Sequence, residues 1–427
     1  MRPDELGHPR DLMTGGAPDR DGFRPAVAWT GLGAAFLGLL SIGFSFHFVS
    51  PILPAMIADL GIGHGAAGLL MSLFALPGIV LSFPAGWLTD RWGPDRTGGL
   101  GLLVMGLGTL AVGAGPTFGV ILAGRTLTGV GVSLAVVALQ RMIAALFAGR
   151  NLGLPMGVSG MAVPLGIILI LNLAGPWSER AGWRQVALGT GTFAVLASLV
   201  FFGVARLLPG SGREGTRPPG GSSSSGPQPA GHLSFRPIWL AGWVWFFANG
   251  AMTAFMTFAP NHFFELGWGV QARGLVTSIP MWGSVLLGPL IGWLSDRQGG
   301  KPAFMGLGMI LMSLALLAVP GGRIPQPVIG IALGGALAAV VTPLLSLPGT
   351  LLATHQVGRG YGILATCANV GIFCLPPAAG LVRDATGGFT GPFLLLGGAA
   401  AAGVLGAEAL RRSRVVPGWT WPRRPHH

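Results

Sequence analysis

Long apolar runs alternate with short polar segments along almost the entire chain. Each run is close to the about 20 residues that an α-helix needs to cross a bilayer. The alternation therefore predicts an all-α membrane protein with twelve transmembrane helices. We expect the spans at residues 27–52, 66–88, 98–116, 117–139, 152–176, 184–208, 237–261, 270–294, 302–320, 325–353, 361–382 and 389–410.

The composition supports this interpretation. Of the 427 residues, 51% are hydrophobic and 9% are charged, and the mean hydropathy is +0.65. Soluble globular proteins carry about 25% charged residues. The net charge of +12 does not indicate a nucleic-acid partner, because the basic residues are scattered over short loops rather than gathered in one domain. The lipid bilayer is the expected partner.

The placement of the basic residues predicts the orientation. An even number of spans puts both termini on the same side of the membrane. Twenty of the 26 Lys and Arg residues fall in the tails and loops on that side, and five fall in the loops on the other. Because loops rich in Lys and Arg stay in the cytoplasm, we expect both termini there. The 25 arginines and one lysine suit a GC-rich bacterial genome, and hence a bacterial cytoplasmic membrane.

A segment rich in Gly, Ser and Pro divides the spans into two groups of six. Residues 209–235 cannot form a packed core and are expected to be a flexible linker. The predicted organisation is a cytoplasmic tail at 1–26, a six-helix bundle at 27–208, the linker, a second six-helix bundle at 236–411, and a cytoplasmic tail at 412–427.

The two groups of spans share an internal repeat. At an offset of 206 residues, positions 54–93 match positions 260–299 with 15 identities in 40, including GWLTDRWG against GWLSDRQG. Two six-helix units have the same orientation, so we expect a pseudo-twofold axis along the membrane normal. A substrate site is then expected between the halves, near the midplane, with rocking of the halves giving alternating access.

The repeated loop motif and a second motif in the fourth span resemble those of a known family. The chain resembles the transporters of the major facilitator superfamily, of the twelve-span bacterial type, and its region from Arg141 to Gly166 resembles the cyanate-permease-like branch. The resemblance rests on the loop motif Gly-x-x-x-Asp-Arg-x-Gly-x-(Arg/Lys), in which the last residue of the first copy stands one place late, and on Arg-x-x-x-Gly-x-Gly in the fourth span. The matching residues are Gly86, Asp90, Arg91, Gly93 and Arg96, then Gly292, Asp296, Arg297, Gly299 and Lys301, and finally Arg125, Gly129 and Gly131.

The loop motif stands at the expected cytoplasmic ends of the second and eighth spans. Its glycines let helices approach closely, and Asp90 or Asp296 can meet the positive N-terminal end of a helix in the other half, or an arginine beside it. The resemblance implies a charge latch that closes the cytoplasmic side in the outward-open state, with Arg91 and Arg297 as partners or membrane anchors. The alternative is a hydrophilic loop that only fixes topology.

Two ionisable side chains lie deep within the predicted spans, and neither is acidic. Arg125 of the fourth span could hold a carboxylate or oxyanion, or could be a structural hub bonded to backbone carbonyls. His47 of the first span could carry a proton, or could simply pack among phenylalanines. Three asparagines are further candidates for substrate contact, with helix–helix hydrogen bonding as the alternative: Asn172, Asn249 and Asn369.

A fixed positive charge without a buried acid disfavours organic cations and favours a small organic or inorganic anion. We therefore expect a secondary active transporter. Because one chain contains both halves, we expect it to be a monomer. Coupling to protons or to a counter-solute stays open. The alternatives are a transporter of neutral or amphipathic compounds, including drug-type efflux, and a non-transporting sensor. We expect no enzyme, cofactor or metal, since the spans contain no acid–base pair or cluster with ligand spacing.

Overall fold

The computed structural model describes residues 25–147, 153–207, 235–298, 300–352 and 356–413, all in helices and short connections. It contains twelve helical segments that are long and apolar enough to span a membrane, as predicted. The predicted tails and linker, and Gly299 of the loop motif, lie almost entirely outside the described residues. The helices are α1 Pro25–His47, α2 Val49–Leu60, α3 His64–Ser72, α4 Leu76–Trp92, α5 Pro94–Ala114, α6 Phe118–Leu146, α7 Gly153–Ala181, α8 Trp183–Leu207, α9 Arg236–Glu265, α10 Val270–Gln298, α11 Lys301–Ala318, α12 Gln326–Leu351, α13 Val357–Thr386 and α14 Thr390–Arg412, with a 3₁₀ turn at Val319–Gly321.

The first two spans are each built from two helices in line. The first breaks between α1 and α2 at Phe48, and the second breaks between α3 and α4. A proline follows each break, Pro51 in one and Pro77 in the other. Because proline has no N–H, it cannot bond the carbonyl four residues earlier, and its ring crowds that carbonyl. The sequence thus breaks both helices about four residues before a proline.

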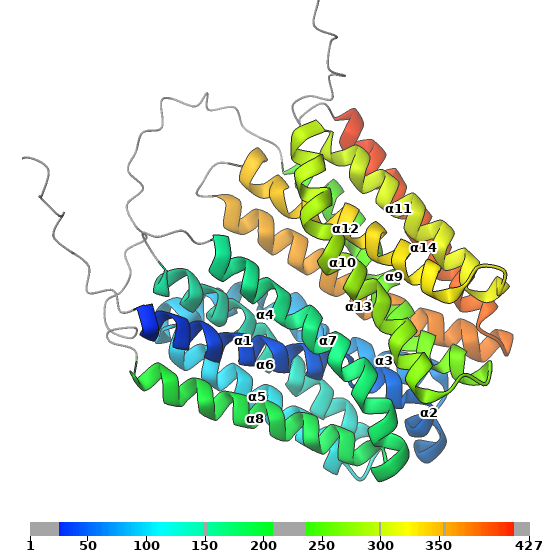
Figure 1. The fold of residues 1–427 in the computed structure, drawn as a ribbon, viewed down its shortest axis with the longest axis horizontal. Coiled ribbons are helices and arrows are strands. Elements are labelled where there is room, and N and C mark those ends of the chain that lie inside the picture. The colour runs from blue at the N-terminus through cyan, green and yellow to red at the C-terminus, as the bar shows by residue number, and fades with distance from the viewer. Residues whose placement is uncertain (1–24, 148–152, 208–234, 299, 353–355, 414–427) are drawn as a thin grey trace, which may run out of the picture.

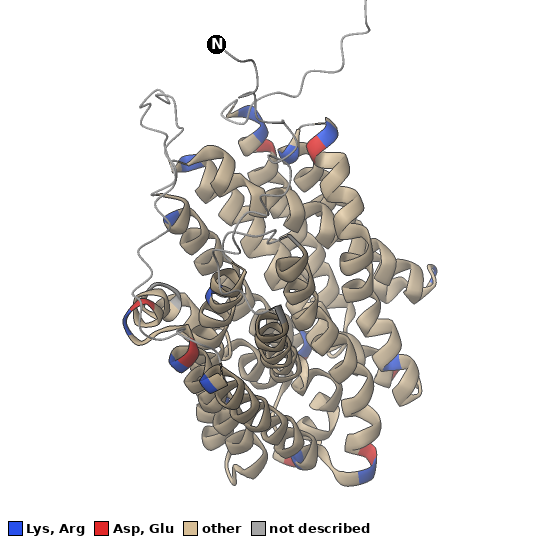
Figure 2. Cartoon of the chain, turned by 60° about the vertical axis from the view of Figure 1, so that its left-hand side comes forward, with Lys and Arg blue, Asp and Glu red and all other residues tan. Residues whose placement is uncertain are grey.

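The helices form two halves that lie side by side, α1–α8 and α9–α14 (Figure 1). We call the end that carries residues 86–96 and 292–301 the motif end, and the opposite end, where α3 and α10 begin, the closed end. Most of the charged residues lie at the ends of the helices (Figure 2). This distribution agrees with the cost of placing charge in a bilayer.

Among the described residues, the apolar core that joins the two halves lies at the closed end. One buried cluster extends through the second half and into the closed end of the first, where it includes Phe48, Leu70 and Ile170. A separate cluster, which includes Leu39 and Leu139, fills the motif end of the first half. Several hydrogen bonds that connect the halves also lie on the closed-end side.

Candidate functional site

Arg125 is the eighth residue of α6 and is fully buried. Its Nε donates to the Leu70 carbonyl at 3.2 Å, and Nη1 donates to the Ser45 carbonyl at 2.7 Å. Nη2 donates to the Phe46 carbonyl at 3.4 Å. These carbonyls stand beside the two helix breaks, where regular helical bonding stops. The guanidinium therefore satisfies backbone oxygens that the breaks release, which is the hub geometry foreseen as one of the two alternatives.

The rest of the fourth-span motif also packs against neighbouring backbone. A Cβ on Gly129 would overlap the Phe74 carbonyl oxygen at the second break, and a Cβ on Gly131 would overlap Met105 of α5. The Arg125 guanidinium also lies 5.0 Å from the centre of the Phe74 ring. The two glycines of Arg-x-x-x-Gly-x-Gly therefore let α6 contact two helices closely. The arginine of the same motif donates hydrogen bonds to the two spans that are broken.

His47 lies close to this cluster, at the last position of α1. It is 2% exposed, and its Nδ1 lies 3.3 Å from the Ser50 hydroxyl. Its ring packs against Phe46, with 4.5 Å between the ring centres. The structure thus brings His47 and Arg125, which the sequence places 78 positions apart, to the same break in the first span. Whether either of them contacts solute stays a prediction.

The three candidate asparagines occupy different settings. Asn172 of α7 donates to Ser278 of α10 at 3.1 Å, and so connects the two halves. Asn369 of α13 packs against Gly78 of α4, also across the halves. Asn249 of α9 donates to the Trp245 carbonyl of its own helix at 3.2 Å. Two of the three therefore lie where one half meets the other.

At the motif end, the first copy of the loop motif forms its ion pair within its own half. Asp90 at the end of α4 pairs with Arg141 at the end of α6. Arg91 lies over the Trp87 ring, while Arg96 is exposed at the start of α5. Gly86 faces Arg141, and Gly93 turns the chain with a positive φ of 86°.

The second copy of the loop motif also forms its ion pair within its own half. Lys301 at the start of α11 lies 3.3 Å from Asp296 and donates to the Ser346 hydroxyl at 2.8 Å. Arg297 lies over the Trp293 ring, as Arg91 lies over Trp87. Gly292 faces Thr342 of its own half. In the described residues the ion pairs of Asp90 and Asp296 both stay within their own halves, so the predicted cross-half latch is not formed in this conformation.

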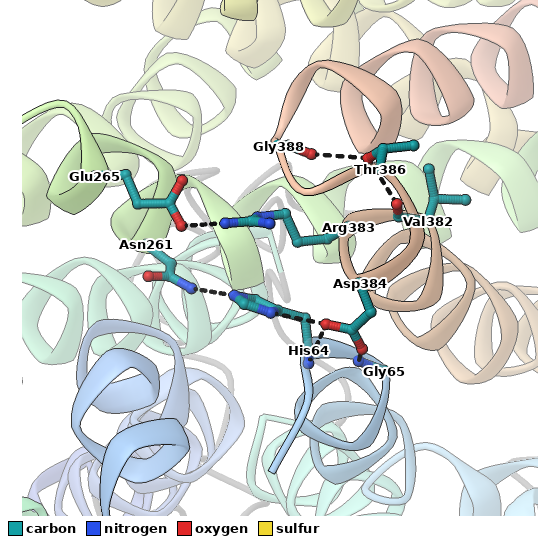
Figure 3. A network of polar contacts seen from close by, with 9 residues as sticks. All are labelled: His64, Gly65, Asn261, Glu265, Val382, Arg383, Asp384, Thr386 and Gly388. Atoms are coloured by element: carbon teal, nitrogen blue, oxygen red, sulfur yellow. Dashed lines mark hydrogen bonds and ion pairs between the residues drawn. The ribbon is translucent and has the colours of Figure 1, made fainter. Parts of the chain in front are cut away.

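The closed end does contain a cross-half contact of this kind. Asp384, near the end of α13, accepts hydrogen bonds from the backbone N–H groups of His64 and Gly65 at 2.9 and 2.8 Å. Its Oδ1 also lies 3.0 Å from His64 Nδ1 (Figure 3). The carboxylate of one half thus caps the positive N-terminal end of α3 in the other. A Cβ on Gly380, one turn earlier, would overlap the His64 carbonyl oxygen.

A second interface at the same end joins α7 to α10. Arg273 of the second half donates to Glu179 of the first at 3.1 Å. The Asn172–Ser278 hydrogen bond lies further along the same pair of helices. The halves are therefore held at two places, one between α3 and α13 and one between α7 and α10.

Comparison with known proteins identifies the family. The family model described as Major Facilitator Superfamily matches residues 35–272 and 246–425. The chain belongs to the major facilitator superfamily. The resemblance inferred from the loop motifs is thereby confirmed, as is the all-α fold of twelve spans.

Several curated superfamily transporters resemble the chain along most of its length. A probable sulfoacetate transporter of Cupriavidus necator, SauU, is 22% identical over 84% of this chain and 87% of the relative. A hexuronate transporter of Bacillus subtilis is 24% identical over 80% of this chain and 85% of the relative. The relatives are transporters, so the chain is a superfamily transporter and not an enzyme.

A solved superfamily structure has the same fold. The nucleoside transporter NupG superposes with a TM-score of 0.71 over 89% of this chain and 99% of its own, at 12% sequence identity. At that identity the likeness concerns the fold alone.

Sequence reasoning did not single out His64, Asp384 or Asn261, although they form the densest polar contact between the halves. The predicted eleventh span ends at residue 382, so Asp384 falls just beyond it in a loop. The residues stand 320 positions apart, and no repeat or motif connects them. The available signal was weak: polar residues at span ends on the side opposite the loop motif.

Proposed function

We propose that the chain is a secondary active transporter that carries a small organic anion by alternating access. Two relatives that match most of the chain are named for anionic solutes, one as a probable sulfoacetate transporter and the other as a hexuronate transporter. Both solutes are small and carry at least one carboxylate or sulfonate. A solute of this class is therefore the first to test.

The distribution of charge carries the proposal. In the described residues every carboxylate lies near a helix end, and the one furthest from an end is Glu408, four residues before the last residue of α14. Arg125, by contrast, is fully buried and is the eighth residue of α6, about two helical turns from its start. A charge inside a low-dielectric protein acts over a longer distance than one in water. We infer that Arg125 favours an anion through its field, since its donors already bond the protein.

The same charges support the orientation. Under the positive-inside rule the motif end faces the cytoplasm, so this conformation corresponds to an inward-facing state. Asp90 and Asp296 would then form their cross-half latch in the outward-facing state, after the closed end has separated. In this view the two ends exchange contacts during each cycle.

Uptake by proteoliposomes tests the proposal. Purified protein is reconstituted, and the initial flux is measured for sulfoacetate, glucuronate, glucose and choline, each against liposomes without protein. We expect flux of at least one of the two anions and little flux of glucose or choline. Flux of choline or glucose alone, or no flux of any of the four, would contradict the proposed substrate class.

Arg125→Lys and Arg125→Met sharpen the result. Lysine keeps the positive charge but not the fork of donors, whereas methionine removes both. If the field of Arg125 selects anions, the lysine variant retains the preference for the anion over glucose and the methionine variant reduces it. The amount of folded protein, measured by gel filtration, normalises both rates.

A further inference from the structure

His64 is held from both sides by the opposite half. It begins α3 in the first half, and its ring lies between two residues of the second (Figure 3). Nδ1 lies 3.0 Å from Oδ1 of Asp384, and Nε2 lies 3.1 Å from Nδ2 of Asn261. The side chain is 16% exposed, so water can reach it. Both ring nitrogens are therefore used in contacts across the halves.

The other interface of the closed end has no such group. At the repeat offset of 206, the position equivalent to His64 is Val270, the first residue of α10, which packs near Gly175 of α7. The ion pair there joins Arg273 to Glu179. Arginine keeps its proton at any physiological pH. Of these two cross-half ion pairs in the described residues, the one between His64 and Asp384 therefore contains the side chain that can gain and lose a proton near neutrality.

The geometry accommodates His64 in both protonation states. In the neutral ring, Nδ1–H donates to Asp384, and Nε2 accepts from the Asn261 amide. A proton from water that binds Nε2 turns this nitrogen into a donor. Rotation of the amide by half a turn presents its oxygen as the acceptor. The added charge then turns the contact to Asp384 into a charge-assisted one, which is roughly twice as strong as a neutral hydrogen bond.

The charged groups around His64 already have partners. On α13, Arg383 donates to Glu265 of α9 at 2.6 Å, beside the ring (Figure 3). On α2, Asp59 accepts from Trp183 at 3.0 Å. On α6, Arg125 bonds backbone carbonyls deeper in the first half. The polar partners of the imidazole are instead Asp384 and Asn261.

His262 is the other histidine at this end. It lies on α9, where its ring packs against Phe263, Phe389 and Phe393 of its own half. Its Nε2 has no hydrogen-bond partner among the described residues, and its link to the first half is indirect, through Phe389, whose ring lies 5.8 Å from that of His64. This residue provides a matched control for His64, one turn away from Glu265 in the same helix.

We propose that His64, clamped between Asp384 and Asn261, is a proton-binding site that holds the closed end shut when it is occupied. The inference rests on the alternating access proposed above and adds a ligand to it, the proton. A proton bound at His64 stabilises the conformation in which α3 contacts α13. Loss of that proton weakens the interface and favours separation at the closed end.

The direction of the pH effect follows from this arrangement. At low pH the site is occupied and the closed end stays shut. At higher pH the site empties and the open fraction increases. One proton allows at most a tenfold change in the equilibrium per pH unit. We expect the open-to-closed ratio to rise about three- to tenfold between pH 5.5 and pH 7.5.

Distances between spin labels in the full-length protein test the proposal without a substrate. Labels are attached to Ala58→Cys in α2 and Thr390→Cys in α14, both exposed at the closed end of opposite halves. Cys367 and Cys374 are first replaced by alanine. The distance distribution is then recorded in liposomes from pH 5.5 to 7.5, for the parent protein and for variants His64→Gln, Asp384→Asn, His262→Gln and Arg273→Gln.

The parent and the His262→Gln variant should show the longer distance more often as the pH rises. His64→Gln and Asp384→Asn should remove most of this dependence. Arg273→Gln should shift the distribution at every pH and keep the dependence. A pH response in His64→Gln as large as in the parent would overturn the proposal, as would a flat response in the parent. Because no solute is added, these results stand apart from the anion flux that tests the proposed function.

Discussion

The two ends of the molecule use similar charged groups in opposite ways. At the motif end, Asp90 pairs with Arg141 and Asp296 with Lys301, each inside one half. At the closed end, Asp384 contacts His64 across the halves. The closed end also joins the halves through Arg273 and Glu179.

This difference shows what fixes the conformation. Ion pairs inside one half keep their geometry when the halves move relative to each other, so they add little to the preference for one state. Pairs across the halves form only in the state that brings them together, and therefore contribute to the equilibrium between states. The cross-half contacts of the closed end thus favour this conformation. Those predicted for Asp90 and Asp296 would favour the opposite one.

A bulky residue in place of Gly380 should have the largest effect on transport, because it disturbs the contact between α3 and α13 at the closed end. Gly380→Val places side-chain atoms against the His64 carbonyl and prevents α3 and α13 from meeting. Overpacking costs about 1–3 kcal/mol, which corresponds to about 5–150-fold in the equilibrium. We expect the solute flux into proteoliposomes to fall by more than about tenfold. Gly362→Val, on the same helix but in open space, should keep most of the parent flux; equal losses in both would refute the explanation.

Substitution of each of two arginines of α6 tests this comparison. Arg125→Met removes the donors for three buried carbonyls, and we expect a loss of about 3 kcal/mol in the free energy of unfolding. Arg141 has 45% of its side chain exposed, and Arg141→Met should cost less than about 0.5 kcal/mol. Thermal unfolding in detergent measures both. A similar melting temperature for the two variants would show that Arg125 does not hold the broken spans together.

The carboxylates of the closed end allow a finer comparison. Asp384→Asn weakens the contact across the halves, whereas Asp59→Asn affects a contact to Trp183 and Arg184 inside the first half. We expect only the former to expose the interface. A cysteine at Ser72, which is buried against Ile372, should react with an impermeant maleimide about fivefold faster in Asp384→Asn. The idea fails if Asp59→Asn accelerates the reaction as much.

The smallest effect is expected at the motif end. In this conformation Asp90→Asn loses only an exposed ion pair, worth less than about 1 kcal/mol. If Asp90 forms a latch in the opposite state, the variant should still insert and fold but should transport about two- to fivefold more slowly. Arg91→Gln, whose side chain lies over Trp87, provides the control. Parent transport rates in Asp90→Asn would remove the latch.

The sequence predicted the spans and their repeat because hydropathy and local motifs determine them. It also identified Arg125, whose motif predicts a place in the fourth span, but its carbonyl partners depend on two helix breaks that periodicity does not show. The contact between His64 and Asp384 was missed, since it joins residues 320 positions apart. Which end is shut could not follow from sequence either, because one sequence must stabilise both conformations of a transporter.

The central claim is that separation at the closed end accompanies approach at the motif end. Spin-label distances at both ends of the protein in liposomes test it most directly. The pair Ala58–Thr390 reports on the closed end, and Ala145–Gly349, on α6 and α12, reports on the motif end. Relative to the parent, Gly380→Val should lengthen the first distance and shorten the second. A longer first distance with an unchanged second one would contradict alternating access in this protein.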